Sequence, residues 1–137
     1  MMDIRQIDQR FAVAPQLQPE DIAAVAEAGY TTLICNRPDG EDPGQPTFDA
    51  IAEAARARGM TVHHIPVSGG AFPSDAIAAF REARQAAEGR VLAYCRSGTR
   101  SATLDALANP DALSADVRIE HAAAAGYDLS PLRRALG

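Results

Sequence analysis

Residues 91–101 read VLAYCRSGTRS, and this stretch decides the fold. Its first four residues are apolar with no polar alternation, which is typical of a strand covered on both faces of a parallel sheet. The remaining seven contain Gly98, which permits a tight turn, and lead at Ser101 into a segment rich in Ala and Leu. The stretch therefore predicts a buried strand, a short cationic loop at its carboxyl end, and then a helix.

The same alternation of strands and helices extends along the chain. Apolar runs predict strands at residues 4–7, 11–13, 30–35, 60–66 and 91–94, the first two as an edge hairpin. Apolar residues at helical spacing predict helices at residues 19–28, 48–58, 75–88, 101–109 and 115–125, with Thr47 and Ser74 as N-caps. This order predicts a three-layer α/β fold with a mainly parallel central sheet flanked by helices, in a single domain of residues 1–137.

Composition narrows the classes of function. The 137 residues carry 13 basic and 18 acidic side chains, a net charge of −5, with no basic cluster. We therefore expect neither nucleic acid nor a membrane as a partner. No apolar run is long enough to span a bilayer and the N-terminus has no apolar signal core, so we expect a cytoplasmic protein. Two cysteines make no disulfide framework and have no metal-ligand spacing, and we expect no metal and no cofactor.

The loop that follows the strand carries the predicted chemistry. A cysteine acts as a nucleophile in its thiolate form, and its usual pKa of about 8.5 falls at helix N-termini and beside cations. Cys95 has both influences, and we predict that Cys95 and Arg100 are catalytic. Loop amides that point inward form a cradle for anions. The predicted anion-binding residues are Arg96, Ser97, Gly98, Thr99, Ser101 and, from a second loop, Arg37.

At these residues the sequence resembles two groups of enzymes. CRSGTRS is similar to the active loop of rhodanese-type sulfurtransferases, in which a cysteine carries a persulfide. Almost the whole chain, including NRPDGE at residues 36–41, resembles the bacterial phosphatase-like domain family of β-lactamase hydrolase-like proteins. That resemblance implies a fold like that of dual-specificity protein tyrosine phosphatases. It also implies fusion of such domains to persulfide-handling metalloenzymes or sulfide-oxidising flavoproteins.

Two features favour sulfur transfer over phosphate hydrolysis. Four residues separate Cys95 from Arg100, whereas the phosphatase signature has five, and a shorter loop should form a tighter cradle. A phosphate ester also needs a general acid for its leaving oxygen, and residues 66–73 contain no carboxylate. The long loop at residues 36–46 offers Asp39, Glu41 and Asp42, while Asp75 is expected to serve a helix N-terminus.

The sequence therefore predicts a rhodanese-like sulfurtransferase that carries sulfane sulfur as a Cys95 persulfide. Its expected partners are a small anionic donor, thiosulfate or a low-molecular-weight persulfide, and a thiol acceptor. A persulfide dioxygenase or a sulfide-oxidising flavoprotein is a further partner that the resemblance implies. One alternative is a phosphatase with a phosphocysteine intermediate. A second alternative is a non-catalytic regulatory module that binds anions.

Three other residues have competing interpretations. Cys35 ends an apolar strand and is expected in the core, the alternative being a resolving thiol for Cys95. His63 and His64 are adjacent on a strand and are expected to point to opposite faces, so they are not predicted to share a metal.

Overall fold

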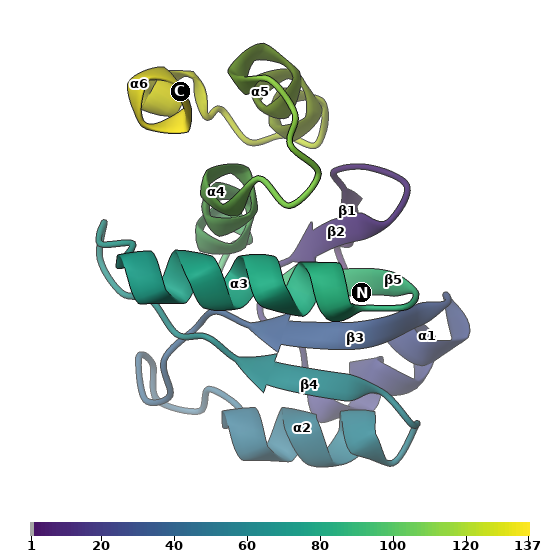
Figure 1. The fold of residues 1–137 in the computed structure, drawn as a ribbon. Coiled ribbons are helices and arrows are strands. Elements are labelled where there is room, and N and C mark those ends of the chain that lie inside the picture. The colour runs from purple at the N-terminus through teal and green to yellow at the C-terminus, as the bar shows by residue number, and fades with distance from the viewer. Residues whose placement is uncertain (1) are drawn as a thin grey trace.

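The computed structural model describes residues 2–137 and contains one five-stranded sheet (Figure 1). The strands follow the sheet order β1-β2-β5-β3-β4. They are β1 (Arg5–Gln6), β2 (Phe11–Ala14), β3 (Tyr30–Cys35), β4 (Thr61–His64) and β5 (Arg90–Tyr94). Only the β1–β2 pair is antiparallel, and β2, β5, β3 and β4 run parallel to one another. The predicted mainly parallel sheet is confirmed.

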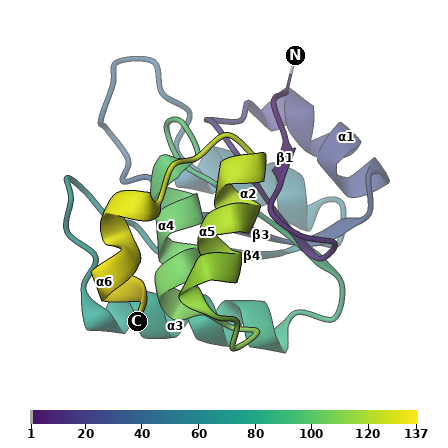
Figure 2. The same cartoon turned by 90° about the horizontal axis from the view of Figure 1, so that it is seen from above.

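Helices cover both faces of this sheet. They are η1 (Pro19–Asp21), α1 (Ile22–Glu27), α2 (Phe48–Arg56), α3 (Ser74–Ala86), α4 (Thr99–Ala108), α5 (Ala115–Ala124), η2 (Ser130–Leu132) and α6 (Arg133–Leu136). Figure 1 shows α1 and α2 on one face and α3 and α4 on the other. In Figure 2, α5 and α6 lie beside α4, against which both helices pack.

Two apolar cores lie on opposite sides of the sheet, because successive strand residues point to opposite faces. On the side of α3 and α4, Val13, Ala93 and Phe80 belong to one buried cluster. On the side of α1 and α2, Leu92 and Ile51 belong to the other. Both faces of the central strands are therefore buried, as their uninterrupted apolar sequences predicted.

The predicted edge hairpin is confirmed, since β1 and β2 pair antiparallel at one edge of the sheet and β2 pairs on its other side with β5. The structure differs from the sequence prediction at two helix starts. Helix α4 begins at Thr99, two residues early, since Gly98 takes the left-handed conformation (φ +94°) and closes the loop sooner. The N-cap of α3 is Pro73 in extended conformation, not Ser74.

The C-terminal residues after α5 also form short helices that were not predicted. The turn η2 and helix α6 are too short for a periodic apolar pattern to reveal them. Leu136 of α6 is buried in the core beneath α4 and α5.

The register of the sheet brings three loops to one edge. Cys35 at the end of β3 aligns with Tyr94 on β5 and with His64 on β4. The loops that leave these three strands therefore start at the same height, at the carboxyl edge where active sites of parallel sheets lie. Their backbones are joined there, since Asn36 N–H donates to the Tyr94 carbonyl at 2.8 Å.

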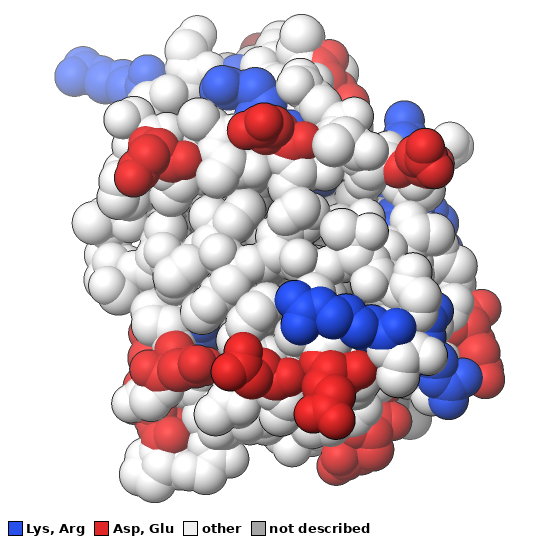
Figure 3. Space-filling view, turned by 60° about the horizontal axis from the view of Figure 1, so that its bottom comes forward, with Lys and Arg blue, Asp and Glu red and all other residues white. Residues whose placement is uncertain are grey.

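The outer surface mixes charges of both signs. On the face shown in Figure 3, acidic side chains gather in a band across the lower part of the view, with basic side chains beside them. Within residues 2–137, none of the helices has the length and apolar character that crossing a bilayer requires.

Candidate active site

Cys95 lies at the floor of the loop between β5 and α4, and its side chain is fully buried (0% exposed). The N–H of Gly98 points back at it and lies 3.1 Å from the Cys95 sulfur. Gly98 itself takes the left-handed conformation (φ +94°), which residues other than glycine adopt at a cost. The N-terminus of α4, with its positive dipole end, therefore faces the sulfur.

The peptide unit between Ser97 and Gly98 is held from its other side by Tyr127. The Tyr127 hydroxyl donates to the Ser97 carbonyl oxygen at 3.1 Å. In a trans peptide the carbonyl and the following N–H point in opposite directions. Tyr127 thus fixes the peptide orientation in which the Gly98 N–H faces Cys95.

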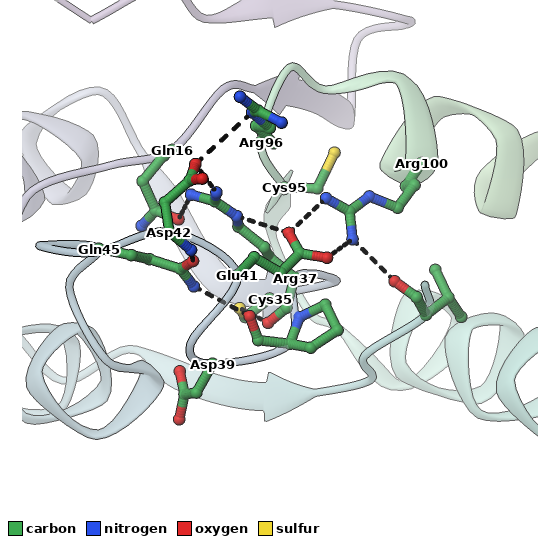
Figure 4. Close-up of polar contacts among 12 residues, drawn as sticks. Gln16, Cys35, Arg37, Asp39, Glu41, Asp42, Gln45, Cys95, Arg96 and Arg100 are labelled. Carbon is green, nitrogen blue, oxygen red and sulfur yellow. Dashed lines mark hydrogen bonds and ion pairs between the residues drawn. The ribbon is translucent and has the colours of Figure 1, made fainter. Parts of the chain in front are cut away.

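Arg100 is anchored along one edge of its guanidinium group. Its Nη1 donates to Glu41 Oε2 (2.9 Å) and to the Val67 carbonyl (2.8 Å), and its Nη2 donates to Glu41 Oε1 (2.8 Å). The hydrogen bonds to Glu41, followed by the negative charges of Cys95 and Glu41, raise the pKa of Arg100. The Nε–Nη2 edge keeps two N–H groups for another acceptor, and Figure 4 shows that edge beside the Cys95 side chain.

Glu41 comes from the long loop between β3 and α2 and lies between two arginines. Besides Arg100, Arg37 donates to it, from Nε to Oε1 at 2.8 Å. The hydrogen bond with Arg100 and then that with Arg37 lower the pKa of Glu41 to about 2. Glu41 is therefore an ionised carboxylate that holds Arg100 in place (Figure 4).

Arg37 is neither exposed nor free to receive an external anion. The residue is only 3% exposed, and its guanidinium also contacts Asp42 Oδ2 (2.7 Å) and Gln16 Oε1 (3.1 Å). Its backbone carbonyl accepts from the Cys35 thiol at 3.4 Å. The structure thus places Arg37 as the internal counter-ion of the loop at residues 36–46.

Ser101 and Asn36 form a second link between the two loops. The Ser101 hydroxyl donates to Asn36 Oδ1 at 2.8 Å, and the Asn36 amide donates to the Ile65 carbonyl at 2.9 Å. Asn36 and Ser101 have no exposed surface. Ser101 was predicted to bind an anion, and its hydroxyl instead joins α4 to the end of β3.

The remaining predicted loop residues point outward. Arg96 has a side chain that is 69% exposed, with Asp42 Oδ2 3.7 Å from its Nε. Figure 4 shows it directed away from the Cys95 sulfur. Ser97 donates from its hydroxyl to the Thr99 hydroxyl at 3.1 Å, and both residues are exposed. Any anion contacts from this part of the loop would come from its backbone.

The sequence profile of "Beta-lactamase hydrolase-like protein, phosphatase-like domain" matches residues 3–114. The chain belongs to this family. A beta-lactamase hydrolase-like protein of Xylella fastidiosa is 41% identical over 106 residues, which cover 77% of this chain and 25% of that protein. A second such protein, from Agrobacterium fabrum, is 41% identical over 98 residues, which cover 72% of this chain and 23% of that protein. The chain spans about a quarter of the length of these relatives.

Solved structures similar to this phosphatase-like domain are phosphatases. A candidate phosphatase from Neisseria meningitidis Z2491 is 36% identical, with a TM-score of 0.85 over 99% of this chain and 97% of that one. The active form of Tk-PTP is 20% identical (TM-score 0.74; 98% and 92% covered). The core of the PP-IP phosphatase SIW14 from S. cerevisiae is 14% identical (TM-score 0.68; 96% and 81%). The last two show the fold alone.

These comparisons confirm the family and the fold that the resemblance implied. They give no support to the main functional prediction, sulfur transfer. They support the phosphatase alternative better, because the matched family is a phosphatase-like domain and the 36% identical structure is a candidate phosphatase.

Cys35 lies in the core, as expected for a residue at the end of a buried strand. It belongs to the apolar cluster under α1 and α2, whereas Ala93, two residues before Cys95, belongs to the cluster on the opposite face. Burial raises the pKa of the Cys35 thiol. In the part of the chain that the structure describes, Cys35 and Cys95 are both free, buried cysteines.

Three residues of the phosphatase-like domain have roles that sequence reasoning missed. Glu41 was considered only as an acid, Asn36 only as a loop residue, and Tyr127 not at all. The local sequence carries a weak signal for Glu41, since it is four residues after Arg37. The local sequence carries no signal for Tyr127. This residue lies outside the matched residues 3–114, and the packing of α5 brings it to Ser97.

Proposed function

We propose that this domain is a cysteine-dependent phosphatase. The Cys95 thiolate attacks phosphorus, the bond from phosphorus to the leaving oxygen breaks, and a phosphocysteine forms. Water then attacks the same phosphorus, the sulfur–phosphorus bond breaks, and the electron pair returns to the sulfur. One water proton passes to the phosphate that is released.

The orientation of Arg100 carries this proposal. Glu41 and the Val67 carbonyl occupy its outer edge and leave the Nε–Nη2 edge directed at Cys95. Two parallel N–H groups match two oxygens of a phosphoryl group, which is the geometry for which arginine is suited. The terminal sulfur of a persulfide is a single acceptor atom, so it could not pair with both N–H groups in this way.

Two further observations support it. The Gly98 N–H and the N-terminus of α4 stabilise negative charge at the sulfur and at the oxygens of the transition state. The 36% identical candidate phosphatase from Neisseria meningitidis covers almost the whole chain.

The test is turnover of an aryl phosphate, with Cys95→Ser and Cys35→Ser compared side by side. Both residues are buried cysteines, but only Cys95 lies beneath Arg100. We expect turnover and a phosphate adduct on Cys95, trapped by acid quenching and located by mass spectrometry. Cys95→Ser should abolish both, and Cys35→Ser should retain them. Absence of turnover and adduct with several aryl phosphates would overturn the proposal.

A second candidate function is sulfur transfer, which one observation favours. The loop has only four residues between Cys95 and Arg100, and in residues 2–137 a single backbone amide, that of Gly98, donates to the sulfur. Incubation with thiosulfate or glutathione persulfide should then add one sulfur atom to Cys95, which a thiol acceptor removes. A chain that takes up neither phosphate nor sulfur would instead match the non-catalytic anion-binding module.

A further inference from the structure

The carboxylates near Cys95 are all committed to other contacts, and this restricts the substrates that the site can use. A phosphatase that cleaves an alkyl ester needs a protonated group beside the leaving oxygen. Glu41 is the carboxylate joined directly to Arg100, through two hydrogen bonds. With a pKa of about 2 it carries no proton to give at neutral pH.

The other acidic residues of the neighbouring loops serve the backbone or Arg37. Asp39 accepts from Phe48 N–H at 2.8 Å, at the start of α2, and Figure 4 shows it directed away from Cys95. Asp42 accepts from Arg37 Nη2 at 2.7 Å. Asp75 accepts from the N–H of Ala76 at 2.9 Å, in the first turn of α3.

The other side chains that could donate a proton are also engaged. The Tyr127 hydroxyl gives its proton to the Ser97 carbonyl, and burial raises its pKa. The His64 ring stacks on Phe48 at 4.4 Å, with Nε2 3.1 Å from the Arg37 carbonyl. The four carboxylates, Tyr127 and His64 thus all make other contacts in the structure, and none of them is placed as a proton donor for the leaving oxygen.

We propose that the site acts on phosphoryl groups whose leaving oxygen is stable as an anion, namely phosphoanhydrides and acyl phosphates. This inference rests on the proposed phosphatase function. The Cys95 thiolate forms the sulfur–phosphorus bond, and the leaving group departs as phosphate or carboxylate with the electron pair of the broken bond. No proton moves in this step. Arg100 compensates the charge on the transferred phosphoryl oxygens.

The experiment measures kcat/KM of the unaltered chain for substrates that differ in leaving group. This constant reports the steps up to departure of the leaving group, the first irreversible step, and so does not depend on the later hydrolysis of phosphocysteine. The series contains pyrophosphate, acetyl phosphate, 4-nitrophenyl phosphate, phenyl phosphate and glycerol 2-phosphate. General acids contribute about 10²- to 10⁴-fold, so we expect the alkyl ester to fall at least about 100-fold below 4-nitrophenyl phosphate.

Glu41→Gln and Asp42→Asn separate a positioning role from a proton-donating one. Loss of a general acid slows poor leaving groups far more than good ones. Loss of a residue that only orients arginine slows all substrates by the same factor. For both variants we expect kcat/KM to fall by the same factor with every substrate.

Two results would overturn the inference and leave the phosphatase standing. One is similar kcat/KM for the alkyl ester and 4-nitrophenyl phosphate. The other is a loss confined to poor leaving groups in either variant. Absence of turnover and of a phosphocysteine with every substrate would overturn the proposed function, and the inference with it.

Discussion

The hydroxyl oxygen of Tyr127 lies 3.1 Å from the carbonyl oxygen of Ser97, thirty residues earlier in the chain. The same peptide unit presents the Gly98 N–H to the Cys95 sulfur on its other side. A C-terminal residue outside the matched family region thus orients the loop that carries the nucleophile. The consequence can be measured.

Tyr127→Phe should lower kcat while changing KM little. A hydrogen bond contributes a net of about 0.5–1.5 kcal/mol, which corresponds to about 2- to 10-fold in rate if it is lost from the transition state. Tyr30→Phe is the matched control, since Tyr30 accepts from Arg90 Nη2 at 3.0 Å at the opposite end of β3. Equal kcat for the two variants would show that Tyr127 has a structural role only.

Gly98→Ala should destabilise the chain and abolish turnover. A Cβ at this position would lie 2.2 Å from the Tyr127 hydroxyl oxygen, and φ is +94°. Gly59→Ala is the control, because Gly59 has a φ of +77° with nothing near its added Cβ. Gly59→Ala should cost only the backbone strain, about 1–3 kcal/mol in urea unfolding. Gly98→Ala should cost more, and equal costs would refute the predicted clash.

Ser101→Ala should reduce the free energy of unfolding by about 1–3 kcal/mol, because it leaves the buried Asn36 oxygen without its donor. It should also lower kcat, since α4 loses its link to β3. Thr47→Ala removes the N-cap of α2 and should cost about 1 kcal/mol without affecting kcat. A Ser101→Ala variant with normal stability and kcat would contradict this prediction.

Glu41 should make stability fall on acidification. Its pKa is lowered in the folded chain, mainly by hydrogen bonding to Arg100, so the unfolded chain binds more protons at low pH. The contribution is fully present above the ordinary pKa of about 4.5 and is lost as pH falls towards about 2. The difference in urea midpoint between wild type and Glu41→Gln should shrink across this range. If the difference in urea midpoint stayed constant with pH, the ion pair between Glu41 and Arg100 would not be the source of the stabilisation.

Much of the fold was predictable because its signals are local. Unbroken apolar runs at residues 30–35 and 91–94 indicated buried parallel strands, and β3 and β5 occupy these positions. Thr47 caps α2 through Ala50 N–H as predicted. The α4 start was missed by two residues, because the left-handed turn at Gly98 depends on the sulfur and tyrosine that surround it.

The sequence by itself determined the family, the order of strands and helices, and the place of Cys95 at the carboxyl edge of a parallel sheet. Those properties follow from periodicity and from residues close together in the chain. Only the tertiary structure decided what Arg37, Glu41 and Tyr127 do. Glu41 meets Arg100 across 59 residues of sequence, and Tyr127 meets Ser97 across 30. Such contacts depend on the register of the sheet and the packing of α5, which bring distant side chains within hydrogen-bond range and which no local pattern encodes.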